Sequence, residues 1–125
     1  MPLISIVVPC YNEQESLPIF LKELDGVVHA MTQTHPDISF EAVLVDDGSA
    51  DATLTVMKAE SAASHPYTIH WYSFSRNFGK EAALFAGLQH AKGDYVATMD
   101  ADMQDPPSLL PQMHEILQTE DYDNV

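Results

Sequence analysis

Four short apolar runs alternate with stretches of helical periodicity, and this alternation limits the folds open to the chain more than any other feature. Strands are predicted at residues 3–8, 40–45, 68–74 and 94–99. Helices are predicted at 13–34, from Ser49 or Asp51 to about 63, at 80–91, and from Pro106 or Pro107 onward. Parallel strands of one sheet need crossover connections, which such helices supply. We therefore expect an α/β domain with a mostly parallel sheet in three layers, α/β/α.

Composition excludes several classes of protein. The chain has 125 residues, enough for one domain, and 5 Lys and Arg against 19 Asp and Glu give a net charge of −14. This charge argues against nucleic-acid binding and against docking on anionic lipid. The single Cys10 cannot form an internal disulfide and fits a reducing, cytoplasmic compartment. No run approaches the roughly 20 apolar residues of a membrane span.

Polar residues follow all four predicted strands at the point where each strand ends. Because the carboxyl ends of parallel strands lie at one edge of a sheet, we expect these groups to converge there, where α/β domains bind ligands. They are Pro9, Tyr11, Asn12 and Glu13 after the first strand, Asp46, Asp47, Gly48 and Ser49 after the second, Ser75, Arg76, Asn77, Gly79 and Lys80 after the third, and Asp100, Asp102 and Gln104 after the fourth.

Asp100 and Asp102 are the strongest candidates for chemistry. Residues two apart on an extended chain point the same way, so both carboxylates can face one spot. Two such charges repel unless a cation lies between them, and a divalent ion with oxygen ligands meets that need. A turn requires one Asp rather than a repeated pair. Asp105, by contrast, is interpreted as the cap of the last helix.

Simpler roles stand beside the functional ones. Asn12 is either the cap of the first helix or a ligand-binding residue. One of Asp46 and Asp47 is expected to be structural. Arg76 and Lys80 either contact phosphate or balance the acidic edge.

Other side chains suggest no further chemistry. Gly48 suits a turn, and no His is placed to activate Cys10. The six His residues show no metal-ligand spacing and are expected at the surface. The glycine motifs of dinucleotide and phosphate-binding loops are absent.

Four segments together resemble family 2 glycosyltransferases, in particular the polyprenyl-phosphate (dolichol-phosphate-type) sugar transferases. They are Val7-Val8-Pro9-Cys10-Tyr11-Asn12-Glu13, Val45-Asp46-Asp47-Gly48-Ser49, Ser75-Arg76-Asn77-Phe78-Gly79-Lys80 and Asp100-Ala101-Asp102-Met103-Gln104-Asp105-Pro106-Pro107. Met103 replaces the usual Leu, and Ala50 stands where Thr is common.

The resemblance implies a GT-A fold that binds a nucleotide-diphospho-sugar, a UDP- or GDP-sugar, and transfers its hexose to a polyprenyl phosphate with inversion. It places Pro9, Tyr11, Glu13 and Asp47 (or Asp46) around base and ribose. It assigns Asp100 to the ribose or a metal-bound water, and Asp102 and Gln104 to Mg²⁺ or Mn²⁺.

The resemblance also implies an acceptor-binding half beyond residue 125. We therefore expect residues 1–125 to be the N-terminal, nucleotide-sugar-binding part of a truncated domain that binds donor without transferring sugar. The full-length parent is expected at the cytoplasmic face of the membrane. Two alternatives remain: a Mg²⁺-binding receiver-type signalling domain, and a non-catalytic assembly module that forms a homodimer through an open sheet edge.

Overall fold

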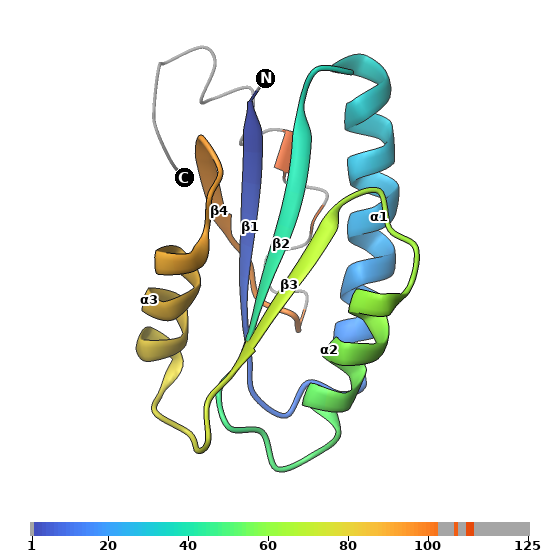
Figure 1. Ribbon diagram of the computed structural model, residues 1–125. Helices are drawn as coiled ribbons and strands as arrows, with labels where there is room; N and C mark the ends of the chain where they lie inside the picture. Colours follow the sequence, from blue (N-terminus) through green and yellow to red (C-terminus); the bar gives the residue numbers. More distant parts are fainter. Residues whose placement is uncertain (1, 103–106, 108–109, 112–125) are drawn as a thin grey trace.

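The computed structural model describes residues 2–102, 107, 110 and 111 (Figure 1). Strands and helices alternate along the chain, as the sequence predicts. In order they are β1 (Leu3–Cys10), α1 (Ser16–Thr34), β2 (Ser39–Asp46), α2 (Thr53–Ala62), β3 (Thr68–Ser73), α3 (Lys80–His90) and β4 (Tyr95–Thr98). The predicted last helix, its core face and its cap Asp105 lie outside the described residues, apart from Pro107, Leu110 and Pro111.

The described strands form one four-stranded parallel sheet in the order β3-β2-β1-β4. The chain moves outward from β1 to β3 and then returns to place β4 on the other side of β1. The strand order therefore reverses between β1 and β4, and a crevice opens at such a reversal. A receiver-type domain would have β1 between β2 and β3, so this order overturns that alternative.

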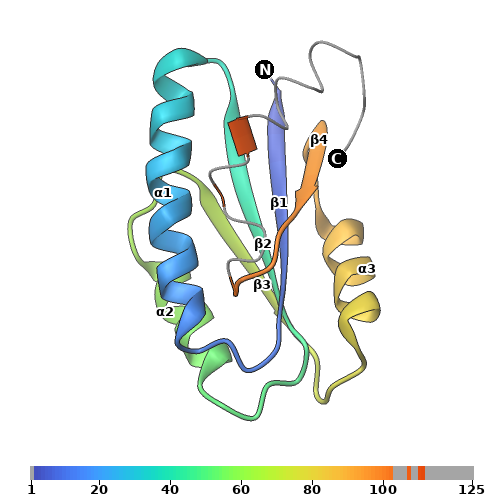
Figure 2. The same ribbon diagram turned by 180° about the vertical axis from the view of Figure 1, so that it is seen from behind.

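Helices cover both faces of the sheet, which confirms the three-layer prediction (Figures 1 and 2). Helices α1 and α2 lie on one face, where the main core is formed by alternate residues of β1 and β2 and the apolar side of α1. The α1 side of this core comprises Leu17, Phe20, Leu21, Leu24, Val28 and Met31, the residues predicted from helical spacing.

Helix α3 lies on the opposite face and packs closely because its contact residues are small. Ala83 and Gly87 are the buried residues of this helix. A Cβ atom at Gly87 would lie 2.4 Å from Cγ1 of Val7, so the helix could not approach β1 as closely with any larger residue. This contact sets the position of the whole helix, including Lys80 at its start.

Pro9 lies inside β1 rather than ending it, contrary to the sequence expectation. The Val7 carbonyl accepts a hydrogen bond from the Met99 amide on the β4 side. The backbone of Pro9, two residues on, faces the same side, where β4 has already ended. The missing N–H of proline therefore removes no ladder hydrogen bond.

His65 corrects the expectation that every histidine lies at the surface. Its side chain is only 7% exposed. Nδ1 lies 2.8 Å from Oδ1 of Asp25 on α1, and Nε2 lies 3.0 Å from Oε1 of Glu60 on α2. The ring therefore ties these two helices together. Within the part of the chain that the structure describes, no helix combines the length and the apolar character needed to cross a bilayer.

Candidate functional site

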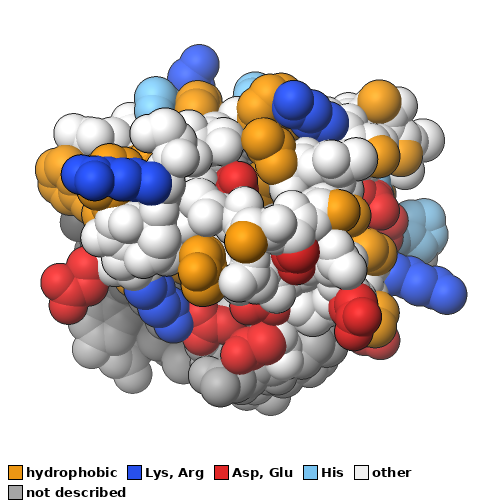
Figure 3. Space-filling model, turned by 90° about the horizontal axis from the view of Figure 1, so that it is seen from below, with side chains coloured by type: hydrophobic (Ala, Val, Ile, Leu, Met, Phe, Trp, Pro, Cys, Tyr) orange, Lys and Arg blue, Asp and Glu red, His pale blue; other side chains and the backbone are white. Residues whose placement is uncertain are grey.

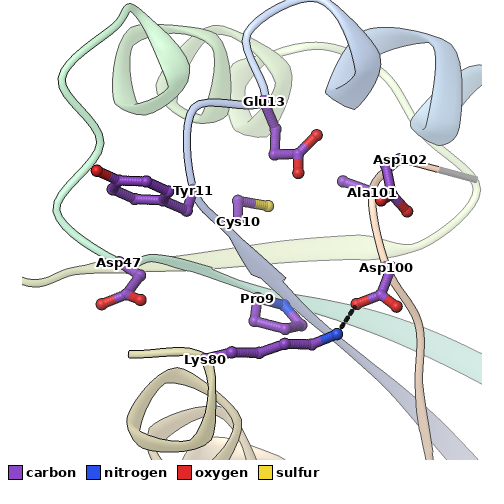
Figure 4. A pocket seen from close by; sticks show the side chains of 9 residues that line it. All are labelled: Pro9, Cys10, Tyr11, Glu13, Asp47, Lys80, Asp100, Ala101 and Asp102. Atoms are coloured by element: carbon purple, nitrogen blue, oxygen red, sulfur yellow. Dashed lines mark ion pairs between the residues drawn. The ribbon is translucent and has the colours of Figure 1, made fainter. Parts of the chain in front are cut away.

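An open pocket of about 350 Å³ lies where the strand order reverses, beyond the carboxyl ends of β1, β2 and β4 (Figure 4). Seven of the predicted site residues line it together with Cys10 and Ala101. The full lining is Pro9, Cys10, Tyr11, Glu13, Asp47, Lys80, Asp100, Ala101 and Asp102. The sequence-predicted convergence on one sheet edge is therefore present in the fold.

Acidic side chains gather on this edge of the molecule. Figure 3 looks onto the edge where the strands end and shows Asp and Glu side chains beside one another, with Lys and Arg side chains around them. In the close view, the carboxylates of Glu13, Asp100 and Asp102 lie around one side of the pocket, while Tyr11 and Asp47 lie on the other (Figure 4). Carboxylates thus lie on both sides of the pocket, and the aromatic ring of Tyr11 lies on the side of Asp47.

Asn12 joins two loops and does not cap α1. The helix begins only at Ser16, and Asn12 has a positive φ of 54°. Its amide donates to the Ser49 hydroxyl, and its side-chain oxygen accepts from the Ala50 amide. Asn12 is not among the described residues that line the pocket, so its cap assignment was wrong and its proposed ligand role stays a prediction.

The same two loops are held by further hydrogen bonds that place Glu13 in the pocket. The Glu13 amide donates to the Thr53 hydroxyl, and its carboxylate accepts from the Ser16 hydroxyl. The Gln14 amide donates to Asp51, and the Ala52 amide donates to the Gln14 side chain. These contacts between loops that follow neighbouring strands fix the wall of the pocket.

The negative charge of Asp51 strengthens the hydrogen bonds that it accepts where these two loops join. Burial acts to raise its pKa, but hydrogen bonds from the Thr53 hydroxyl and from the amides of Thr53 and Gln14 outweigh that effect. The net result is a pKa below the ordinary carboxyl value. The ionised form of Asp51 therefore stabilises the junction.

Asp46 and Asp47 are both buried, yet they do different things. The carboxylate of Asp46 accepts from the Ser49 amide at 3.0 Å and the Ser73 hydroxyl at 3.2 Å, and it does not belong to the described lining. This supports a structural role for one member of the pair. Asp47 lines the pocket.

The carboxylate of Asp47 also holds the loop between β3 and α3. It accepts from the amide of Phe78 at 2.8 Å, the amide of Gly79 at 3.1 Å and the side chain of Asn77 at 3.1 Å. Gly48 lets the neighbouring loop pass against this one, since its φ is 67° and a Cβ there would lie 2.1 Å from the carbonyl carbon of Arg76. Asp47 thereby positions Lys80, the first residue of α3.

The two predicted phosphate contacts separate in the fold. Lys80 enters the pocket, and its Nζ lies 2.7 Å from Oδ1 of Asp100 (Figure 4). Arg76 is exposed and lies over the ring of Phe78, 4.8 Å from its centroid, rather than in the described pocket lining. The sequence placed Arg76 and Lys80 at the same edge of the sheet and so predicted phosphate contact for both. Only the path of the loop between β3 and α3 distinguishes the two residues.

The donor set of the pocket suits a divalent cation that shares its coordination with a ligand. Asp100 and Asp102 supply hard oxygen atoms, and Gln104, the other predicted metal ligand, lies outside the described residues. Among residues 2–102, 107, 110 and 111, no three His, Cys, Asp or Glu side chains could together hold a metal ion. Mg²⁺ commonly binds one or two carboxylates and completes its shell with substrate phosphates and water.

Cys10 lines the pocket but does not act as a nucleophile. It is buried, and burial first, with the nearby Glu13, Asp46 and Asp100 carboxylates, raises the pKa of its thiol far above the ordinary range. A thiol that stays protonated is unreactive. Ala101 also lines the pocket, and its position between two aspartates was the one sequence signal that could have identified it.

Comparison with protein-family models matches residues 5–125 to "Glycosyl transferase family 2". The chain belongs to this family. It is 46% identical over 112 residues to the "Bactoprenol glucosyl transferase" of Shigella phage SfV, an alignment that covers 90% of this chain and 34% of the relative. It is 42% identical over 124 residues to the "Undecaprenyl-phosphate 4-deoxy-4-formamido-L-arabinose transferase" of Sodalis glossinidius (strain morsitans), covering 98% and 35%. The chain thus spans about a third of the length of these relatives.

Solved structures match the fold, which is that of GT-A glycosyltransferases. Residues 1–349 of S. aureus TarS match with a TM-score of 0.73 at 22% identity, covering 97% of this chain and 33% of that one. The mannosyltransferase PcManGT from Pyrobaculum calidifontis, solved with GDP-Man and Mn²⁺, matches with a TM-score of 0.73 at 25% identity, covering 93% and 32%. The predicted family and fold are confirmed.

Proposed function

We propose that this chain binds a nucleotide-diphospho-sugar together with Mg²⁺ or Mn²⁺, as the donor-binding part of an inverting polyprenyl-phosphate sugar transferase. The observation that carries the proposal is the pocket at the strand-order reversal, where Glu13, Asp100, Asp102 and Lys80 meet in a family 2 chain. The names of the two relatives refer to bactoprenol and to undecaprenyl phosphate, which supports the proposed class of acceptor.

The base and ribose are proposed to lie on the side of Tyr11 and Asp47. The Tyr11 side chain is 47% exposed beside the pocket, so its ring offers a face on which a base can stack. Pro9 supplies an apolar floor, and Glu13, which faces this side from across the pocket, accepts hydrogen bonds from the ribose hydroxyls. Asp47 belongs to the described pocket lining and Asp46 does not, so of the two adjacent aspartates Asp47 is the better candidate.

The diphosphate is proposed to lie on the side of Asp100, Asp102 and Lys80. Asp102 would hold the cation with Gln104, and Asp100 would contact the ribose or a water in the shell of the cation. When bound, the cation stabilises the negative charge that develops on the leaving nucleoside diphosphate. Lys80 adds a second positive charge from the start of α3.

The reaction proposed for the whole protein is a single displacement at the sugar carbon by an oxygen of the polyprenyl phosphate. A phosphate acceptor is already ionised near neutral pH, so no side chain needs to remove a proton from it. We assign donor binding to this chain and transfer to the longer protein, at the cytoplasmic face of the membrane, and we expect this chain alone to transfer no sugar.

Calorimetric titration with UDP, GDP and their sugar conjugates, with and without Mn²⁺, tests the proposal. We expect binding to one nucleotide series that depends on Mn²⁺, weakened about tenfold or more in Asp102→Asn because a charged cation contact is lost. Lys92→Met, which changes a charge just beyond the end of α3 and outside the described pocket lining, is the control and should bind as the unchanged chain does. Cation-independent binding, or equal binding by Asp102→Asn, would contradict the assignment.

A further inference from the structure

An ion pair spans the pocket between two elements that are distant in the sequence. Lys80 begins α3, Asp100 follows β4, and Nζ of Lys80 lies 2.7 Å from Oδ1 of Asp100 (Figure 4). One of the two aspartates proposed to face a cation therefore already has a positive partner, supplied by the chain itself.

The ion pair also separates two cavities. Lys80 and Asp100 line the main pocket, and both also line a second cavity of about 120 Å³ with Leu84, Thr98 and Met99. The Lys80 side chain is 60% exposed, whereas that of Asp100 is 20% exposed. The flexible lysine therefore has open space on both sides, while the carboxylate is the more fixed partner.

Two kinds of negative group can pair with Lys80: the carboxylates of the pocket and the phosphates of an entering donor. Glu13, Asp47, Asp100 and Asp102 all line the pocket, and Lys80 is the one basic residue in the described lining. A cation held by Asp102 brings its shell of water to Asp100, and this water competes with Lys80 for the same carboxylate oxygen atoms. An entering diphosphate needs a positive charge that Asp100 does not already neutralise.

We propose that Lys80 is an exchangeable counterion: it neutralises Asp100 before a ligand binds, yields Asp100 to the water shell of the divalent cation, and then contacts the diphosphate of the donor. This inference rests on the proposed function and adds to it an order of binding, with the cation before the donor. Cation and donor bind with positive coupling, because the cation releases the lysine that the donor needs. An exposed ion pair suits such an exchange since it is weak enough to break.

Calorimetry on Lys80→Met separates the two roles of the lysine. With Mn²⁺ alone, the variant should bind about two- to fivefold tighter, because the competing ion pair has gone. With Mn²⁺ present, the same variant should bind the nucleotide diphosphate about tenfold weaker, because a charged contact has gone. Opposite changes in the two affinities are the signature of exchange, since damage to the fold would weaken both.

Two controls keep the result specific. Lys92→Met removes the same charge from a position just beyond the other end of α3 and should leave both affinities unchanged, which excludes a general effect of net charge. Lys80→Arg retains the charge and should recover most of the nucleotide affinity. In the unchanged chain, Mg²⁺ alone should shift the side-chain NMR signal of Lys80, a readout that does not depend on any variant folding.

The outcomes distinguish this inference from the function on which it rests. If the unchanged chain binds Mn²⁺ and nucleotide but Lys80→Met binds Mn²⁺ no more tightly, or Mg²⁺ leaves the Lys80 signal in place, the exchange is wrong and donor binding stands. If the unchanged chain binds no nucleotide with or without Mn²⁺, the proposed function fails first.

Discussion

Glu41 and Asp100 lie at opposite ends of the same sheet and show two uses of a carboxylate. Glu41, near the start of β2, is 4% exposed. It accepts from the hydroxyl of Ser5, its partner in the β1–β2 register, and from the Lys92 amide at 2.8 Å, and His70 lies 3.5 Å away. Asp100 lies beyond the carboxyl end of β4. Its side chain lines the pocket and forms an ion pair with the exposed side chain of Lys80.

The difference identifies which acidic residues are structural. A buried carboxylate is tolerated where fixed donors of the fold satisfy it, as the Lys92 amide and the Ser5 hydroxyl do for Glu41. A carboxylate that faces a cavity and relies on an exposed lysine remains available to a ligand. The contrast predicts that loss of Glu41 damages stability, whereas loss of a carboxylate that lines the pocket, such as Asp100 or Asp102, damages binding.

Replacing Glu41 should have the largest effect on stability. Glu41→Ala leaves the Ser5 hydroxyl and the Lys92 amide without their acceptor, and we expect the free energy of unfolding to fall by about 3 kcal/mol. Urea unfolding followed by circular dichroism measures the change. Mn²⁺-dependent nucleotide binding of the folded variant should be unaffected. If the free energy of unfolding fell by well under 1 kcal/mol, Glu41 would be no more structural than the carboxylates that line the pocket.

Asp47 combines both uses, so its replacement should affect both properties. Asp47→Asn puts an amide group against the donors of Asn77, Phe78 and Gly79, and we expect a loss of about 2 kcal/mol in unfolding free energy. Nucleotide affinity should also fall, because the loop that presents Lys80 loosens. Asn77→Ala, which removes a single donor, should cost about 1 kcal/mol. An unchanged stability for Asp47→Asn would mean that other contacts hold the loop.

Asp51 should show a small effect that depends on pH. Its pKa in the folded chain lies below the ordinary value of 3.8, so its charge stabilises the fold above that value. The contribution is lost as pH falls through the lowered folded pKa. Because Asp51 is exposed, we expect Asp51→Ala to cost less than about 1 kcal/mol near neutral pH. The difference from the unchanged chain should shrink below about pH 4, and a difference that grows on acidification would reverse the sign of this argument.

Asp102→Asn should change stability least, by no more than about 0.5 kcal/mol, because the residue is exposed at the pocket. The same urea unfolding experiment measures it. A large loss of stability here would place Asp102 with Glu41 as a structural carboxylate, and would undermine its assignment to the cation.

The sequence predicted which residues meet at one edge of the sheet better than it predicted the contacts of each residue. Seven predicted residues line the pocket because the ends of parallel strands meet at one edge, whatever their loops do. Asn12 was misassigned as a cap because capping patterns describe a helix alone. Here its donor and acceptor serve Ser49 and Ala50 of a neighbouring loop, which lies 37 or more residues away in the chain.

What the sequence by itself determined is the alternation of strands and helices, the apolar face of α1, the family, and the edge where the chemistry gathers. The family follows from the resemblance of four motifs, and the others follow from local periodicity and from chain order, which any segment carries with it. Only the tertiary structure decided that Asp46 is enclosed while Asp47 faces the pocket, that Arg76 lies over Phe78, and that Lys80 reaches Asp100. These outcomes depend on how closely α3 approaches β1 at Gly87 and how the loops pass one another at Gly48, distances set by packing between residues far apart in the chain.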